Sequence, residues 1–207
     1  MSSVAVPVPA AGGPIGRGVR LLVGLALYGA AIALIVRAHL GVGPWDVLSQ
    51  GVAAVSGLPF GLVTIVIGAL VLVLWWPLRE RPGVGTIANV VLVGLAAQLV
   101  LDLTRPAEDL VVAVALLLGG TLLLAVATAV YVGAGLGAGP RDGLMLGLHR
   151  RLGLPLWLAR TLVEGTVLVA GWLLGGDVGV GTLLFALTIG PLCGLTVRLL
   201  APAALHR

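Results

Sequence analysis

Two aspartates that end the same short pattern are the first candidates for chemistry in this chain. Asp46 ends the run LGVGPWD over residues 40–46, and Asp142 ends the run LGAGPRD over residues 136–142. Glycine permits an unwound backbone, proline favours the first turn of a helix, and a carboxylate there complements the positive end of the helix dipole. Each run therefore predicts a backbone break and a helix start, where backbone groups and the carboxylate bind a polar solute or an ion. The break motif comprises Gly41, Gly43, Pro44, Gly137, Gly139 and Pro140.

A second candidate consists of one arginine and one glutamate in an otherwise apolar run. Arg160 and Glu164 are four residues apart, so they lie one helical turn apart on the same side of a helix. Ionisable groups inside a membrane cost free energy and usually face a bundle interior or an aqueous cavity. We therefore expect this pair to bind substrate or an ion, and a structural ion pair that joins helices is the alternative. Asn89, in another apolar run, either adds an amide to this site or hydrogen-bonds across helices.

Catalysis has little support in the sequence. There is no His-Glu-x-x-His, Gly-x-Ser-x-Gly or P-loop motif, and the three histidines lie apart, at predicted helix ends or tails. A proteolytic pair of carboxylates would require Asp46 and Asp142 to converge on one water, and their Pro-Trp and Pro-Arg contexts carry no motif for it. We expect no enzyme activity, no cofactor and no metal site.

The composition indicates that these residues belong to a membrane protein. Of 207 residues, 59% are hydrophobic and 10% are charged, whereas about a quarter of the residues of a soluble domain are charged. The apolar content also excludes a disordered chain. All twelve basic residues are arginines and the formal net charge is +4. No soluble basic module accompanies them, so we expect a lipid bilayer and no nucleic acid as partner.

The lengths of the apolar segments predict an all-α membrane protein with six transmembrane helices and two short helices. Crossing about 30 Å of hydrocarbon takes about 20 helical residues. The expected spans are residues 19–37, 60–78, 85–103, 110–134, 156–174 and 180–200. The two short segments, residues 44–55 and 140–152, would each reach only about 18 Å. They are either re-entrant half-spanning helices or interfacial amphipathic helices.

An internal repeat organises these segments. Three separated motifs recur 96 residues apart: GPxD at 43 and 139, GLP at 57 and 153, and GVGT at 83 and 179. The predicted division is a flexible tail over 1–17, a first membrane repeat over 18–103, a second over 104–200 and a short tail over 201–207. The same offset relates Arg160 to Thr64 and Glu164 to Gly68, so the charged pair breaks the symmetry of the repeat.

The arginines indicate how the repeats are oriented. Repeats are inverted if the short helices do not cross the membrane and parallel if they do. Only the six-crossing arrangement gathers most arginines on the cytoplasmic side and leaves Arg37 and Arg105 outside. The inside set is Arg17, Arg20, Arg79, Arg81, Arg141, Arg150, Arg151, Arg198 and Arg207. We therefore predict two inverted three-span repeats in a bacterial plasma membrane, with both termini in the cytoplasm.

The chain resembles the YczE/YitT-like family of bacterial multi-pass integral membrane proteins. The residues that carry the resemblance are GPWD at 43–46, GT at 85–86, GPRDG at 139–143, Arg160 with Glu164, GG at 175–176, GT at 181–182 and GP at 190–191. The resemblance extends from about residue 19 to residue 200. It implies a small multi-pass protein of the plasma membrane, commonly described as uncharacterised or as a permease, and supplies no substrate or catalytic residues.

Two functions from different classes fit these observations. The first is a transporter or permease for a small polar or charged solute, with a polar site between inverted repeats that includes Asp46, Asp142, Arg160 and Glu164. The second is a non-transporting membrane protein that assists the assembly or regulation of another membrane complex, in which the repeat motifs serve only packing. Under the first hypothesis a homodimer would supply wall area that one copy of this length lacks.

Overall fold

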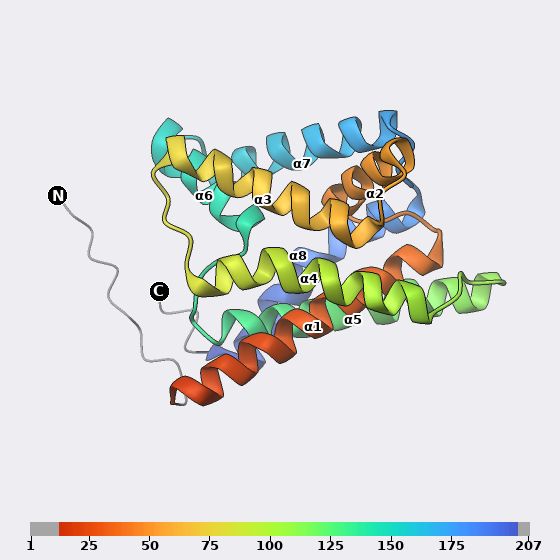
Figure 1. Cartoon of the computed structure of the whole chain (residues 1–207), viewed down its shortest axis with the longest axis horizontal. Coiled ribbons are helices and arrows are strands. Elements are labelled where there is room, and N and C mark those ends of the chain that lie inside the picture. The colour runs from red at the N-terminus through yellow and green to blue at the C-terminus, as the bar shows by residue number, and fades with distance from the viewer. Residues whose placement is uncertain (1–12, 203–207) are drawn as a thin grey trace.

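The computed structural model describes residues 13–202, and all regular elements in this range are helical (Figure 1). The helices are α1 (Pro14–Ala38), α2 (Pro44–Ser56), α3 (Phe60–Leu78), α4 (Val84–Leu103), α5 (Leu110–Val132), α6 (Pro140–Leu152), α7 (Leu156–Leu173) and α8 (Val180–Leu200). All except α2 and α6 are long and apolar enough to cross a membrane. This confirms the predicted all-α class with six candidate spans and two short helices.

The first helix starts earlier than the sequence predicts. Gly13 is the N-cap of α1 and Pro14 occupies its first turn, so residues 14–17 belong to the helix and not to the predicted tail. The Arg17 Nε donates a hydrogen bond to the Ala134 carbonyl at 2.9 Å, which fixes this turn against the end of α5. The rest of the amino-terminal tail, residues 1–12, and residues 203–207 lie outside the described residues.

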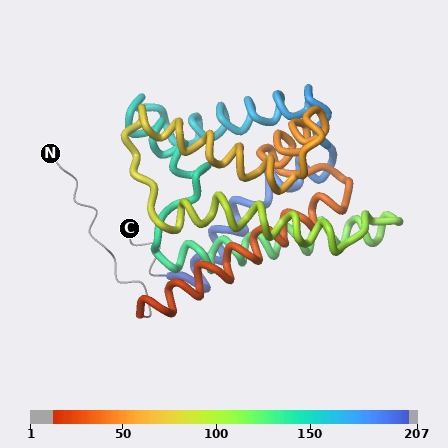
Figure 2. Tube along the Cα trace, viewed as in Figure 1, coloured from red at the N-terminus to blue at the C-terminus, as the bar shows by residue number. Residues whose placement is uncertain are grey.

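The helices form two layers (Figures 1 and 2). One layer contains α1, α4, α5 and α8, and the other contains α3 and α7, with α2 and α6 towards its opposite ends. Each layer has its own cluster of buried side chains, one centred on α1 and α5 and the other on α2, α3 and α6. The start of α1 contacts the end of α5, and the Ala107 N–H before α5 donates to the Arg37 carbonyl at the end of α1. Helices α1 and α5 therefore run in opposite directions.

The helix starts recur at one spacing. Pro14 and Leu110, Pro44 and Pro140, Phe60 and Leu156, and Val84 and Val180 are each 96 residues apart. We call residues 13–103 the first half and residues 104–202 the second half.

The two halves exchange equivalent hydrogen bonds. The Gly85 N–H at the start of α4 donates to the Leu136 carbonyl at 2.9 Å, and the Gly181 N–H at the start of α8 donates to the Leu40 carbonyl at 2.7 Å. Each break motif therefore packs on the last helix of the other half. Gly41, with φ of +99°, shows why this contact needs glycine, because a Cβ atom there would collide with the backbone of Gly179.

The contact between α3 and α4 is not repeated between α7 and α8. In the first half, the Gly61 N–H donates to Gln98 Oε1 at 2.9 Å, and a Cβ atom on Gly94 would lie only 2.5 Å from the Gly61 carbonyl oxygen. In the second half, the counterpart of Gly61 is Trp157, and a Cβ atom on Gly190, the counterpart of Gly94, would meet no atom of residues 13–202 within 4 Å. Helix α7 packs instead on α2 and α6.

Replacing Gly94 and Gly190 one at a time tests this difference. We expect Gly94→Ala to lower the stability of the protein by about 1–3 kcal/mol, because the methyl group forces α3 and α4 apart. Gly190→Ala is the matched control and should change stability by less than about 0.5 kcal/mol. The measurement is the thermal unfolding midpoint of the detergent-purified variants. Equal shifts for both would contradict the packing described above.

Candidate functional site

The amino-terminal turns of the two short helices meet inside the molecule. Asp46 lies in the first turn of α2, and Arg141 lies in the first turn of α6. The Arg141 Nη2 is 3.3 Å from the Asp46 Oδ1, and the Asp46 side chain is only 4% exposed. A buried ion pair therefore joins the two break motifs, between residues that are 95 positions apart in the chain. The partner of Asp46 is Arg141 and not Asp142.

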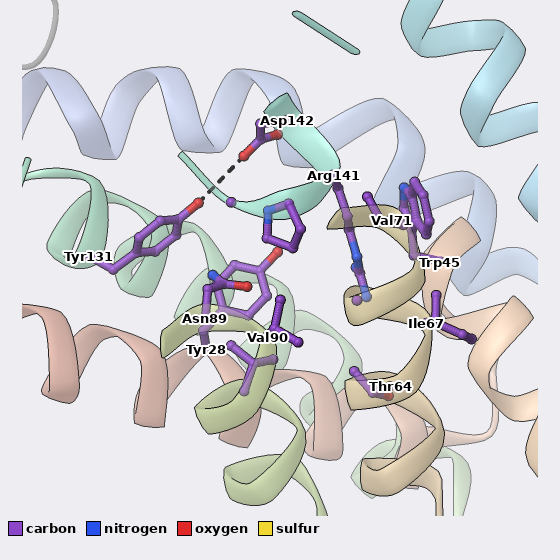
Figure 3. A pocket seen from close by; sticks show the side chains of 14 residues that line it. Tyr28, Trp45, Thr64, Ile67, Val71, Asn89, Val90, Tyr131, Arg141 and Asp142 are labelled. Atoms are coloured by element: carbon purple, nitrogen blue, oxygen red, sulfur yellow. Dashed lines mark hydrogen bonds between the residues drawn. The ribbon is translucent and has the colours of Figure 1, made fainter. Parts of the chain in front are cut away.

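Arg141 also lies against an aromatic ring. Its guanidinium carbon is 5.3 Å from the ring centroid of Trp45, a distance at which a cation is attracted to the face of the ring. Figure 3 shows the Arg141 side chain extending past Trp45 toward Thr64 and Ile67. Trp45 packs with Ile67 and Val71 near the middle of α3, so the start of α2 lies at the depth of the centre of that helix.

Asp142, the repeat counterpart of Asp46, has different surroundings. The Tyr131 hydroxyl donates a long hydrogen bond to its Oδ2 at 3.5 Å (Figure 3). Within residues 13–202, no arginine or histidine side chain forms an ion pair with this carboxylate. Asp142 is accessible to solvent, whereas Asp46 is buried. Tyr131 is itself held edge-to-face against Tyr28, with ring centroids 5.9 Å apart.

Two cavities adjoin at these residues. The smaller has a volume of about 60 Å³ and is lined by Asn89 and Thr64 among others. The larger has a volume of about 210 Å³ and is lined by groups that include Asp46, Arg160, Glu164 and Cys193. Five residues line both cavities: Tyr28, Trp45, Tyr131, Arg141 and Asp142. Arg141 and its aromatic neighbours therefore stand between the two spaces.

Arg160 and Glu164 line the larger cavity from α7. The Arg160 Nε donates to the Glu164 Oε1 at 2.9 Å, one turn along the same helix. Their side chains are 51% and 26% exposed. The ion pair lies within one helix, so it does not join neighbouring helices, which was the structural alternative at the sequence level.

The structure brings together four of the five predicted binding residues. Asp46, Asp142, Arg160 and Glu164 line the larger cavity, and Asn89 lines the smaller one beside it. The predicted break residues act around this site: Gly43 and Gly139 are the N-caps of α2 and α6, and Gly41 and Gly137 have positive φ angles. Pro44 and Pro140 are the first residues of the two helices.

Sequence reasoning missed the role of Arg141. Charge placement along the sequence puts it among the arginines that orient the spans, but its side chain is three-quarters buried and points into the protein. The reason is its pairing with Asp46 across the two halves, which charge counting along the chain does not reveal. The sequence signal for an internal role was that Arg141 lies inside the break motif and not beside a long apolar segment. The aromatic residues Tyr28 and Tyr131 and the single cysteine, Cys193, also line the site without any sequence signal.

The fold and site together define a multi-pass helical membrane protein in which charged groups from its two halves line one cavity. The family model described as "Family of unknown function (DUF6198)" matches residues 15–198, and the chain belongs to this family. This agrees with the YczE-like resemblance.

Three relatives match over most of their length. An "Uncharacterized protein" of Haemophilus influenzae is 38% identical over 87% of this chain and 83% of its own. The "Uncharacterized membrane protein YczE" of Bacillus subtilis is 32% identical over 88% of this chain and 84% of its own. The "Uncharacterized protein YyaS" of the same organism is 26% identical over 78% of this chain and 83% of its own. No solved structure matches.

Removing Arg141 should destabilise the protein strongly. Arg141→Ala leaves Asp46 buried without its counter-charge. We therefore expect the free energy of unfolding of the purified protein to fall by about 3–5 kcal/mol, measured by thermal unfolding. Asp46→Asn in the same background should restore part of that loss. The matched control is Arg150→Ala, also on α6, which breaks a pair with Glu80 in which the arginine is 58% exposed. Its effect should be at most about 1 kcal/mol, and a similar loss in both variants would refute the special position of Arg141.

Proposed function

We propose that this protein is a transporter or permease for a small polar or charged solute in the bacterial plasma membrane. The observation that carries the proposal is the larger cavity, where charged groups from both halves meet at the starts of two short helices. Ionisable groups within the depth of a membrane face water-filled cavities or substrate paths. Helix breaks that meet between two halves of a membrane protein are a common form of transporter binding site.

The proposed architecture is two inverted three-span repeats. The spacing of 96 residues between helix starts, the opposite directions of α1 and α5, and the exchanged hydrogen bonds at Gly85 and Gly181 support it. A pair of equivalent contacts, each made by one half to the other, is what a two-fold relation between the halves requires. Arginine placement then favours both termini in the cytoplasm.

We propose further that α2 and α6 are half-spanning rather than interfacial. Each has 13 residues and so reaches only about 20 Å. Their amino-terminal turns meet through Asp46 and Arg141, whereas Ser56, at the end of α2, and Leu152, at the end of α6, are exposed. Helices lying on opposite surfaces of the bilayer would not place these two turns in contact.

A second candidate is a non-transporting membrane protein that assists the assembly or regulation of another membrane complex. The observation that favours it is the position of α7, which packs mainly on α2 and α6 and leaves Trp157 and Trp172 exposed. In this case the central charges hold the halves together, and no aqueous path reaches them.

Reporter fusions test the inverted arrangement. A fusion after Arg81 should report a cytoplasmic location and a fusion after Arg105 an external one, because one crossing by α4 separates them. The measurement compares a reporter active only in the cytoplasm with one active only outside. The same location for both positions would rule out the inverted repeats.

Cysteine labelling tests whether water reaches the cavity. In a Cys193→Ala background, Asp142→Cys and Glu164→Cys should react with a membrane-impermeant thiol reagent, because both positions line the larger cavity. Ser49→Cys is the control, since Ser49 on α2 is fully buried and should remain unlabelled. If neither cavity position reacts from either side of the membrane, transport is excluded and the assembly role is favoured.

A further inference from the structure

We infer that Asp142 binds a small cation that carries N–H donors, of the guanidinium or ammonium type, and that this cation is the solute of the larger cavity. The inference rests on the proposed function and names its substrate class. It stands on an asymmetry between two equivalent carboxylates and on the charges that line the cavity.

The protein already contains a carboxylate bound to a guanidinium group, at Asp46. At Asp46, a guanidinium group from Arg141 lies 3.3 Å from the carboxylate and 5.3 Å from the face of Trp45. A guanidinium group donates in its plane to a carboxylate and stacks its face on an aromatic ring. The first break motif thus already holds a cation that contacts both a carboxylate and an indole ring.

In the second break motif, no cationic side chain among residues 13–202 forms an ion pair with the carboxylate. Asp142 is the counterpart of Asp46, and the residue that corresponds to Arg141 in the first half is Trp45. The exchanged hydrogen bonds of Gly85 and Gly181 show that the backbones of the two break motifs have equivalent partners in the opposite half. Because Trp45 carries no charge, the position equivalent to Arg141 does not supply a cation to Asp142.

The charges of the cavity lead to the same class of ligand. Three carboxylates and two guanidinium groups line it: Asp46, Asp142, Glu164, Arg141 and Arg160. Arg141 pairs with Asp46, and Arg160 pairs with Glu164, so the carboxylate of Asp142 is the one left over. A net negative charge in a membrane interior is costly unless a positive charge accompanies it. A cationic ligand at Asp142 brings the cavity to neutrality.

The walls beside Asp142 suit an organic cation. Tyr28 and Tyr131 meet edge-to-face at 81°, and Phe185 lines the same cavity. Aromatic faces attract cations, most strongly where water is excluded. The volume of about 210 Å³ is below the range of about 300–1,000 Å³ for drug-sized ligands, so the solute is small.

The single cysteine of the chain provides the measurement. Cys193 lines the same cavity, so the unaltered protein reports the local potential through its rate of reaction with thiol reagents of opposite charge. The quantity to measure is the ratio of two reaction rates, that of trimethylammonium-ethyl methanethiosulfonate over that of sulfonatoethyl methanethiosulfonate. We expect this ratio to be about tenfold higher for Cys193 than for a small free thiol in solution. Methylguanidinium and methylammonium should slow the cationic reagent and raise the thermal midpoint, whereas equal concentrations of sodium or tetramethylammonium should not.

Two variants decide the role of Asp142. Asp142→Asn should abolish both the charge preference and the protection, while Asp142→Glu should retain them. The control is Glu108→Gln, which removes an exposed carboxylate of the loop before α5 and should change neither. Protection that survives Asp142→Asn, protection equal to that by sodium, or no charge preference would overturn the inference.

The cysteine labelling at positions 142 and 164 distinguishes a wrong ligand class from a wrong proposed function. If those cysteines react but Asp142→Asn leaves the cation effects unchanged, a cavity exists and its ligand belongs to another class. If Arg160 moves to neutralise Asp142, Arg160→Ala will create cation protection that the unaltered protein lacks, which also counts against the inference.

Discussion

The ion pair between Asp46 and Arg141 is the interaction on which the centre of this protein depends. It joins the first turn of α2 to the first turn of α6, the two helices that begin at the break motifs. A buried carboxylate is tolerated only where a partner and hydrogen bonds replace the water it has lost. The position of Arg141 is therefore fixed by Asp46, and Arg141 in turn separates the two cavities that it lines.

The glycines of the break motifs make that pairing sterically possible. The loops before α2 and α6 pass so close to the starts of α8 and α4 that a side chain on Gly41 or Gly137 would collide with the opposite half. At this short distance, the Leu40 carbonyl accepts a hydrogen bond from the Gly181 N–H, and the Leu136 carbonyl accepts one from the Gly85 N–H. Backbone groups released by the helix breaks are thus satisfied within the protein, as a membrane interior requires.

The second half departs from the first along α7, the helix from which Arg160 and Glu164 line the larger of the two adjoining cavities. Trp157 replaces Gly61, Arg160 replaces Thr64 and Glu164 replaces Gly68. Gly61 lets α3 pack closely on α4 through Gly94, whereas no atom in the described part of the chain would contact a Cβ atom on Gly190 of α8. Equivalent backbones with different side chains therefore give a closed contact in one half and an open, charged space in the other.

The sequence alone determined the membrane class, the number of long and short helices and the spacing of 96 residues, because hydrophobic length and glycine-proline breaks act locally. It also selected Asp46, Asp142, Arg160 and Glu164, since charges in apolar segments are rare enough to be noticed. Only the tertiary structure decided that Asp46 is buried with Arg141 while Asp142 stands open beside Tyr131. The two motifs share their glycines, proline and aspartate, so local rules alone do not give the two aspartates different surroundings. Their difference arises from the residue that the opposite half places against each, which is a contact over about a hundred positions of the chain.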